Sequence, residues 1–232
     1  MSKIGIIGAM DLEVDALKAQ MQITKEVTKA GMIFCDGILN GANVVVVKCG
    51  IGKVNAGMCV QILEDLFDVT HVINTGVAGS LNADLDICDI LISKDAIYHD
   101  FDTTIFGYAP GQVPGTSSAA FCADPHMIEL AEESCKKACP DVTCRSGRVV
   151  TGDQFISSKE VKERLIKDFG GFCAEMEGCA IAHAATLNNL PFVIIRAISD
   201  KADDSAEMDY PTYERAAAKH SAALVADFVT RL

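Results

Sequence analysis

Acidic residues follow three apolar runs in this chain. Glu13 comes soon after the first run, Glu175 and Glu177 follow a short run in the second half, and Asp200 follows a run near the C-terminus. The carboxyl ends of strands in an open α/β fold lie at one edge of the sheet, where ligands bind. We therefore expect these carboxylates to form one site, where they could transfer protons or bind hydroxyl groups.

Each of these groups also has a structural explanation. Glu13 lies where a helix is expected to begin, and the helix dipole favours an acidic first turn. Glu175 and Glu177 also precede a helix and could cap it, or, on either side of Met176, they could bind the two hydroxyls of a ribose. The polar residues that begin at Arg196 directly continue an apolar strand, which favours a ligand site there over a structural role.

The glycine-containing segments do not match nucleotide-binding motifs. Residues 5–8 lack the G-x-G-x-x-G spacing of a dinucleotide site, and residues 50–53 lack the Ser or Thr of a phosphate loop. The small residues at 74–79 would let a ligand approach the backbone, although a tight turn is the simpler explanation. No metal or organic cofactor is indicated.

Apolar runs alternate with helical patterns along the chain. Runs rich in Val and Ile, typical of buried strands, occur at 4–7, 44–47, 72–74, 87–92, 149–150 and 192–195. Between them apolar residues recur at helical spacing, as in Val60, Leu63 and Phe67. The alternation predicts an α/β fold: a single domain over residues 1–232, a three-layer α/β/α sandwich around a mixed, largely parallel β-sheet.

Residues 98–118 do not follow this alternation. Aromatic residues and prolines occur there among Gly, Thr and Ser, without the period of a helix or a strand. Long loops inside a compact domain usually have a function. This aromatic-rich segment is expected to cap a pocket or to pack on another subunit.

The overall charge limits the classes of partner. The formal net charge of −12, with 50% hydrophobic residues, predicts a compact acidic protein. Binding to nucleic acid or to an acidic membrane requires clustered Lys and Arg, so the negative net charge argues against both partners. A small-molecule ligand is the remaining expectation.

The ten cysteines form no recognisable disulfide or metal pattern. Cys135, Cys139 and Cys144 lack the paired C-x-x-C spacing of a zinc site, and the others are scattered among apolar neighbours. Reduced and mostly buried thiols are therefore expected. The absence of a signal sequence or a membrane-spanning run favours a cytoplasmic location.

Several strings of residues also occur together in a specific order. They are 4–10 followed by Glu13, then 50–54, 74–79, 98–100, 106–108, 152–156, 175–177 and 196–200. In these strings, essentially from end to end, the chain resembles the 5′-methylthioadenosine/S-adenosylhomocysteine nucleosidases of the nucleoside phosphorylase superfamily. The resemblance implies the fold of that superfamily and hydrolysis of an adenine thionucleoside, which releases adenine and a thioribose for methionine salvage.

The resemblance also implies roles for individual residues. Glu13 corresponds to the base that deprotonates the attacking water, which Arg196 and Glu175 help to hold. Asp200 corresponds to the acid that protonates nitrogen 7 of the purine ring, supported by Ser199.

The same resemblance implies the substrate contacts. It assigns Phe155 and the main chain of Ile156 to the adenine, Met176 and Glu177 to the ribose hydroxyls, Ala78 and Gly79 to the side of the ribose, and Met10, Ile51 and Tyr210 to the alkylthio tail. It also implies a homodimer in which Phe106 and Pro114 reach into the neighbouring pocket.

Two positions depart from the usual family pattern. Val77 replaces a Ser that lies beside the attacking water, and Thr103 replaces an apolar residue near the tail pocket. The first removes a hydroxyl contact to the water, and the second leaves the tail preference open.

The implied reaction sets a requirement on Asp200. A purine is a poor leaving group unless it is protonated, and a positioned general acid contributes about 100- to 10,000-fold. An aspartic acid with an ordinary pKa of about 3.9 would be ionised at neutral pH. Burial under the base or a solvent proton relay should therefore raise the pKa of Asp200 or supply its proton.

Two alternatives and a choice of substrates stay open. A purine nucleoside phosphorylase would need cationic clamps for phosphate, but no Arg precedes Arg145, and the first half offers only Lys3 and Lys53 near the relevant strings. A silent nucleoside-binding protein would not need both Glu13 and Asp200. Methylthioadenosine, S-adenosylhomocysteine, 5′-deoxyadenosine and aminodeoxyfutalosine are all compatible with the strings.

Overall fold

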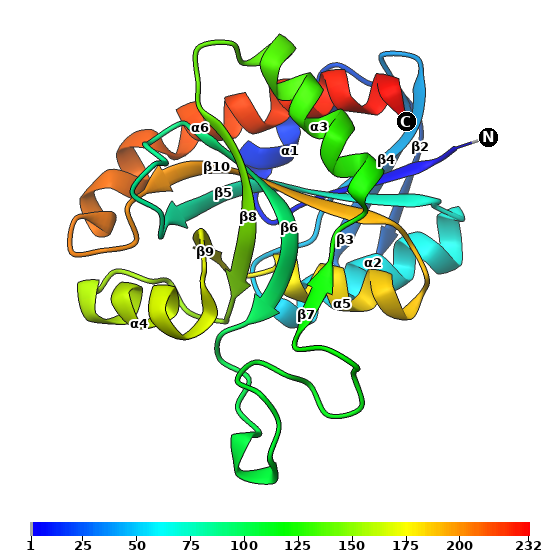
Figure 1. The fold of residues 1–232 in the computed structure, drawn as a ribbon. Coiled ribbons are helices and arrows are strands. Elements are labelled where there is room, and N and C mark those ends of the chain that lie inside the picture. Colours follow the sequence, from blue (N-terminus) through cyan, green and yellow to red (C-terminus); the bar gives the residue numbers. More distant parts are fainter. Residues whose placement is uncertain (1) are drawn as a thin grey trace.

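The computed structural model describes residues 2–232, which form one ten-stranded sheet covered by helices (Figure 1). The strands are β1 (Ile4–Gly8), β2 (Gln22–Lys29), β3 (Met32–Leu39), β4 (Ala42–Lys48), β5 (His71–Ser80), β6 (Ile90–Tyr98), β7 (Ala120–Cys122), β8 (Cys144–Thr151), β9 (Cys173–Glu175) and β10 (Phe192–Asp200). The helices are α1 (Asp11–Lys18), α2 (Lys53–Phe67), α3 (Pro125–Ala138), α4 (Lys159–Phe169), α5 (Gly178–Leu187) and α6 (Ala206–Phe228), with the 3-10 turns η1 (Thr104–Phe106) and η2 (Val229–Arg231).

The helices cover both faces of the sheet. Helices α1, α3 and α6 pack together on one face, and α2 packs with α5 on the other (Figure 1). The strands between them are apolar because both faces are covered, and β1 and β10 are buried along their whole length. This arrangement confirms the predicted α/β/α layers.

The sheet is mixed and partly closes on itself. Strands β4, β1, β5 and β10 are parallel neighbours at its centre, whereas β2 and β3 form an antiparallel hairpin at one edge. Strand β5 also pairs with β9, and β9, β8, β6 and β10 lead back to β5. The closed ring brings the carboxyl ends of β5, β9 and β10 close together.

Two predictions need correction, and one hairpin was not predicted. The small residues at 74–79 do not form a turn, because β5 continues through them to Ser80 and pairs with β10. Residues 87–89 precede β6 instead of belonging to it. The hairpin of β2 and β3 was not predicted, because β2 is polar and exposed along nearly its whole length and so lacks an apolar run.

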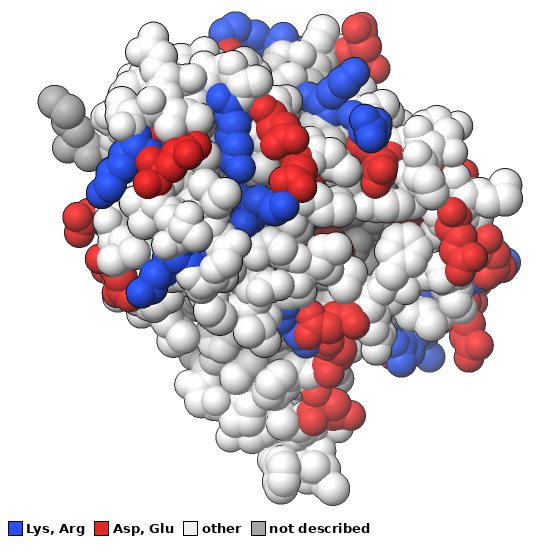
Figure 2. All heavy atoms as spheres, turned by 180° about the vertical axis from the view of Figure 1, so that it is seen from behind, with Lys and Arg blue, Asp and Glu red and all other residues white. Residues whose placement is uncertain are grey.

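The loop between β6 and β7 projects from the body, at the bottom of Figure 1. At its tip Ile105 is 88% exposed and Phe106 76% exposed. Figure 2 shows an uncharged tip below a face on which acidic and basic side chains are scattered. Within residues 2–232, no helix has the length and apolar character needed to cross a membrane.

Candidate active site

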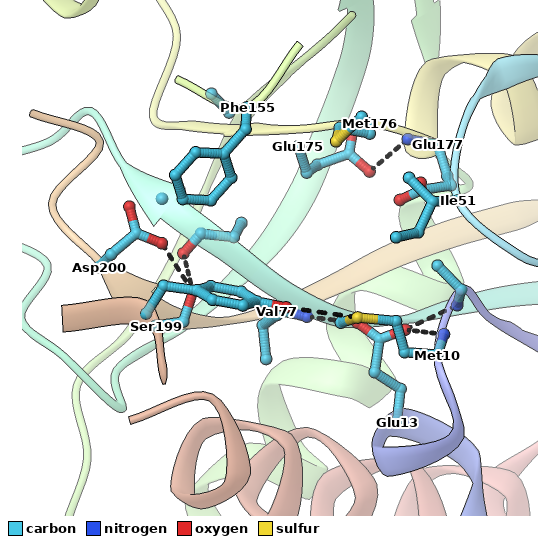
Figure 3. A pocket seen from close by; sticks show the side chains of 15 residues that line it. Met10, Glu13, Ile51, Val77, Phe155, Glu175, Met176, Glu177, Ser199 and Asp200 are labelled. Atoms are coloured by element: carbon cyan, nitrogen blue, oxygen red, sulfur yellow. Dashed lines mark hydrogen bonds between the residues drawn. The ribbon is translucent and has the colours of Figure 1, made fainter. Parts of the chain in front are cut away.

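A pocket of about 310 Å³ opens at the carboxyl ends of β1, β5, β9 and β10 (Figure 3). Its lining residues are Ala9, Met10, Glu13, Ile51, Val77, Ala78, Gly79, Phe155, Ala174, Glu175, Met176, Glu177, Ser199, Asp200 and Tyr210. Most of this surface is apolar, and the polar groups are concentrated in a few carboxylates. Such a combination is typical of a small-molecule site.

Glu13 is fixed by backbone donors. One carboxylate oxygen accepts hydrogen bonds from the amides of Ala9 at 2.6 Å and Met10 at 3.0 Å, and the other accepts one from the amide of Val77 at 3.0 Å. Burial raises the pKa of Glu13, although Arg196 and these amides oppose the shift. The side chain is therefore a rigid and comparatively basic carboxylate.

Asp200 lies at another side of the pocket, at the end of β10 (Figure 3). Its oxygens accept hydrogen bonds from the hydroxyl of Ser199 and the amide of Ala202, each at 2.8 Å. Burial raises the pKa of Asp200 against the effect of both donors. This is the direction that the sequence predicted for a general acid.

Glu175, in the pocket wall, forms a buried ion pair with Arg196 behind it. The Arg196 guanidinium donates to Glu175 at 2.5 Å and also to the side chain of Asn74. Glu175 accepts further hydrogen bonds from the amides at 177 and 178 and from the hydroxyl of Thr151. Because these donors occupy Glu175, its main effect in this structure is to fix the wall and the charge of Arg196.

Glu177 is a further buried carboxyl group of the pocket lining. Its oxygen accepts a hydrogen bond from the amide of Gly52 at 2.8 Å. Burial, with the nearby charge of Glu175, raises the pKa of Glu177 to about 8. A buried carboxyl group of this kind is able to exchange hydrogen bonds with ligand hydroxyls in either protonation state.

Two glycines of β5 make room for the carboxylates. A Cβ atom at Gly76 would lie 2.4 Å from a Glu13 carboxylate oxygen, and one at Gly79 would lie 2.7 Å from an Asp200 oxygen. Either contact is far inside van der Waals distance. These positions therefore need glycine for close approach and not for an unusual backbone conformation.

The structure brings most of the predicted site residues together. Arg196 does not line the pocket but lies fully buried behind it, and Ile156 lines a small adjoining cavity of about 30 Å³. Phe106 and Pro114 lie on the exposed loop, away from this chain's own pocket.

Sequence reasoning missed four residues at or behind the pocket. Ala9 and Ala174 line it, and the side chains of Asn74 and Thr151 support it from behind. Asn74 and Thr151 each stand within or just after an apolar run, and a polar residue in that place was the available signal.

Cations are sparse at the pocket. Among the described residues that line it, none is Lys or Arg. Lys53, at the start of α2, is paired with Asp100 at 2.6 Å, and Lys3 is paired with Asp36 at 2.9 Å. The lining therefore offers no clamp for a phosphate dianion.

Comparisons with known proteins agree with this geometry. The family described as the phosphorylase superfamily matches residues 3–230. A 5′-methylthioadenosine/S-adenosylhomocysteine nucleosidase of Geobacillus sp. (strain WCH70) is 42% identical over 99% of each chain.

Two solved structures are similarly close. The nucleosidase of the same name from Neisseria meningitidis, in complex with methylthio-immucillin-A, has a TM-score of 0.96 and 36% identity, covering 100% of both chains. The one from Colwellia psychrerythraea 34H, in complex with adenine, has a TM-score of 0.96 and 38% identity over 100% of this chain and 96% of its own. This chain therefore belongs to the phosphorylase superfamily and, within it, to the 5′-methylthioadenosine/S-adenosylhomocysteine nucleosidases.

Proposed function

We propose that this protein hydrolyses the N-glycosidic bond of 5′-methylthioadenosine and S-adenosylhomocysteine, releasing adenine and the corresponding thioribose. 5′-Deoxyadenosine, which keeps the adenine and the ribose but lacks the sulfur, is a third substrate. The observation that carries this proposal is the placement of Glu13 and Asp200 at different sides of one pocket, with a raised pKa at both (Figure 3). One of two such carboxyl groups can activate the attacking water while the other protonates the leaving base.

Glu13 is the base. Three backbone amides hold its carboxylate in one orientation, so a water molecule on the free side of the oxygens would be aligned for attack at the anomeric carbon. Its raised pKa makes it a better proton acceptor. Asp200 is the acid that protonates the purine, and Ser199 orients it.

The charge of the pocket suits a cationic transition state. Glu13, Glu175 and Glu177 surround the single guanidinium of Arg196, so the group carries more negative than positive charge when it is ionised. Cleavage of a glycosidic bond leaves positive charge on the sugar. Fixed carboxylates in a water-poor site stabilise that charge more than they stabilise the neutral substrate.

The remaining lining residues fit the parts of the nucleoside. Phe155, half exposed at the rim, and the backbone near Ile156 would bind the adenine beside Asp200. Met176 and Glu177 would bind the ribose hydroxyls, with Ala78 and Gly79 along its side. The tail would lie among Met10, Ile51 and Tyr210, where the Tyr210 hydroxyl already contacts the Met10 sulfur at 3.3 Å.

The active unit is proposed to be a cytoplasmic homodimer. The exposed Ile105 and Phe106 form an apolar tip on the projecting loop, and apolar surface of this kind usually marks a protein contact. Phe106 and Pro114 would then complete the partner's pocket. Light scattering should give twice the chain mass, and Phe106→Ala should raise KM more than it lowers kcat.

Adenine release from methylthioadenosine tests the reaction directly. The purified protein is assayed in phosphate-free buffer and again with added phosphate, and the sugar product is identified each time. We expect free methylthioribose in both buffers at the same rate. A requirement for phosphate, or a sugar 1-phosphate product, would make the protein a phosphorylase and leave Glu13 without its role.

A further inference from the structure

Three cysteines far from the pocket line a second cavity. Cys135 lies near the end of α3, Cys139 directly after that helix, and Cys144 begins β8. All three line a surface cavity of about 280 Å³, together with Lys136 on its rim. The chain spacing gave no sign of this, because the turn at 139–143 brings Cys144 back to the helix.

The backbone keeps these thiols together. The amide of Val142 donates to the carbonyl of Cys139 at 3.3 Å, which closes the turn. The next amide, at Thr143, donates to Asp89 at 2.7 Å, and Cys144 is in register with Ile90 of β6. The turn is therefore anchored at both ends, which fixes Cys139 and Cys144 on the wall of the cavity that Cys135 also lines.

The three thiols differ in access and in partners. Cys135 is 1% exposed and Cys139 6% exposed, whereas Cys144 is only half-buried. The Cys139 sulfur donates to the carbonyl of His220 at 3.5 Å. Cys144 is therefore the thiol that a small solute reaches most easily, and within residues 2–232 the Cys135 sulfur has no such backbone acceptor.

A thiol reaction fits this cluster better than a metal ion does. Among residues 2–232, no group of three or more His, Cys, Asp or Glu side chains is arranged to hold a metal. Contacts with the Cys135 thiol lower the pKa of both Cys139 and Cys144, and the same contacts raise the pKa of Cys135. Of the two thiols whose ionisation is favoured, Cys144 is the more exposed, and the thiolate is the reactive form.

We propose that Cys144 and Cys135 form a reversible disulfide when the protein meets a peroxide, so that the α3–β8 junction is a site of thiol modification. The Cys144 thiolate attacks hydrogen peroxide; a sulfur–oxygen bond forms, the oxygen–oxygen bond breaks, and hydroxide leaves and takes up a proton to become water. Cys135 then loses its proton and attacks the Cys144 sulfur; the sulfur–sulfur bond forms and the second oxygen leaves as water. Two thiols are oxidised and one peroxide is reduced to two waters.

This site is separate from the proposed catalytic site. Cys144 begins β8 and Thr151, which supports Glu175, ends it, so the two sites are roughly 20 Å apart along one strand at about 3.3 Å per residue. The inference therefore does not depend on the proposed activity.

Peptide mapping of the oxidised full-length protein tests the proposal. Peroxide-treated protein is alkylated and digested with trypsin without reduction, which separates residues 95–136 from residues 138–145. We expect these two peptides to be joined, with the loss of two hydrogens, and to separate when dithiothreitol is added. Absence of the joined pair, or a bridge confined to 138–145, would overturn the proposal.

Three serine variants assign the bridge. Cys144→Ser should abolish the joined peptide, whereas the matched variant Cys139→Ser should keep it. Cys122→Ser is the second control, because the exposed Cys122 lies in the same tryptic peptide as Cys135. A joined peptide that survives in Cys144→Ser or disappears in Cys122→Ser would contradict the assignment.

Discussion

Burial raises the pKa of a carboxyl group on each of two sides of the pocket, but the surroundings of the two groups differ. On one side, Glu13 lies with Glu175 and Glu177 around a single buried Arg196, and three backbone amides hold its carboxylate. On the other side, Asp200 is held by one hydroxyl and one amide. The first side is a rigid cluster with excess negative charge, and the second is a single lining carboxyl group, whose pKa the charges of Asp209 and Asp203 also raise.

This difference suggests a division of labour. A base that must stay in place and oppose a cation benefits from rigidity and surrounding charge. An acid that must give its proton away and recover it benefits from isolation. The predictions below change one side at a time.

Removing either proton-transfer group should have the largest effect. Asp200→Asn keeps the shape but cannot protonate the purine, so kcat on methylthioadenosine should fall by about 100- to 10,000-fold. The kcat of Glu13→Gln should fall at least as far, because this substitution removes a negative charge as well as the base. Adenine release measures both, and a loss of less than tenfold in either would contradict the assigned role.

Ionisation of Glu177, beside Glu13, Glu175 and Arg196, should make the folded protein less stable as the pH rises. The Glu177 carboxyl has a folded pKa of about 8 against an ordinary value of 4.5, so between these values the folded protein keeps a proton that the unfolded chain has lost. Unfolding free energy should therefore fall as the pH rises through this window, by a few kcal/mol at about 1.4 kcal/mol per pKa unit.

Glu177→Gln isolates that effect. The variant should be as stable as the wild type near pH 4 and more stable near pH 9, as measured by urea unfolding of the ligand-free protein at both pH values. Parallel pH profiles for the two proteins would show that Glu177 does not titrate in this range.

Alanine substitutions at the two glycines of β5 test how rigid each side of the pocket is. Gly76→Ala places a Cβ 2.4 Å from Glu13, whose oxygens are already fixed, and should lower kcat by about 100-fold through misplacement of the base. Gly79→Ala forces Asp200 and Ala202 to move and should cost about tenfold. Gly57→Ala, in α2 with no atom within 4 Å of the new Cβ, is the control and should leave kcat unchanged. Equal losses at 76 and 79 would mean that the sides are equally rigid.

Val77→Ser should have the smallest effect. The amide of Val77 already holds Glu13, so the side chain affects only the neighbouring water. A serine hydroxyl adds one hydrogen bond worth about 1 kcal/mol, and kcat should rise by about threefold to tenfold. A decrease in kcat would indicate that the apolar side chain of Val77 favours the reaction.

Much of this site could be predicted from sequence because its residues follow apolar strands. Glu13 and Asp200 each come at or soon after a strand end, and a strand end in an α/β fold is a defined place. The closed ring of strands could not be predicted, since it depends on the pairing of β5 with β9, which are far apart in the chain. The cluster of Cys135 and Cys144 was missed for a similar reason. It depends on the turn at 139–143 and not on a regular spacing in the sequence.

The most direct test of the division of labour uses a substrate that needs no acid. The 4-nitrophenyl glycoside of 5-methylthioribose releases 4-nitrophenolate, an anion that is stable without protonation, so Asp200→Asn should cleave it at nearly the wild-type rate, whereas Glu13→Gln should stay slow. Equal impairment of both variants on this substrate would contradict the account, because Asp200 would then act on something other than the leaving group.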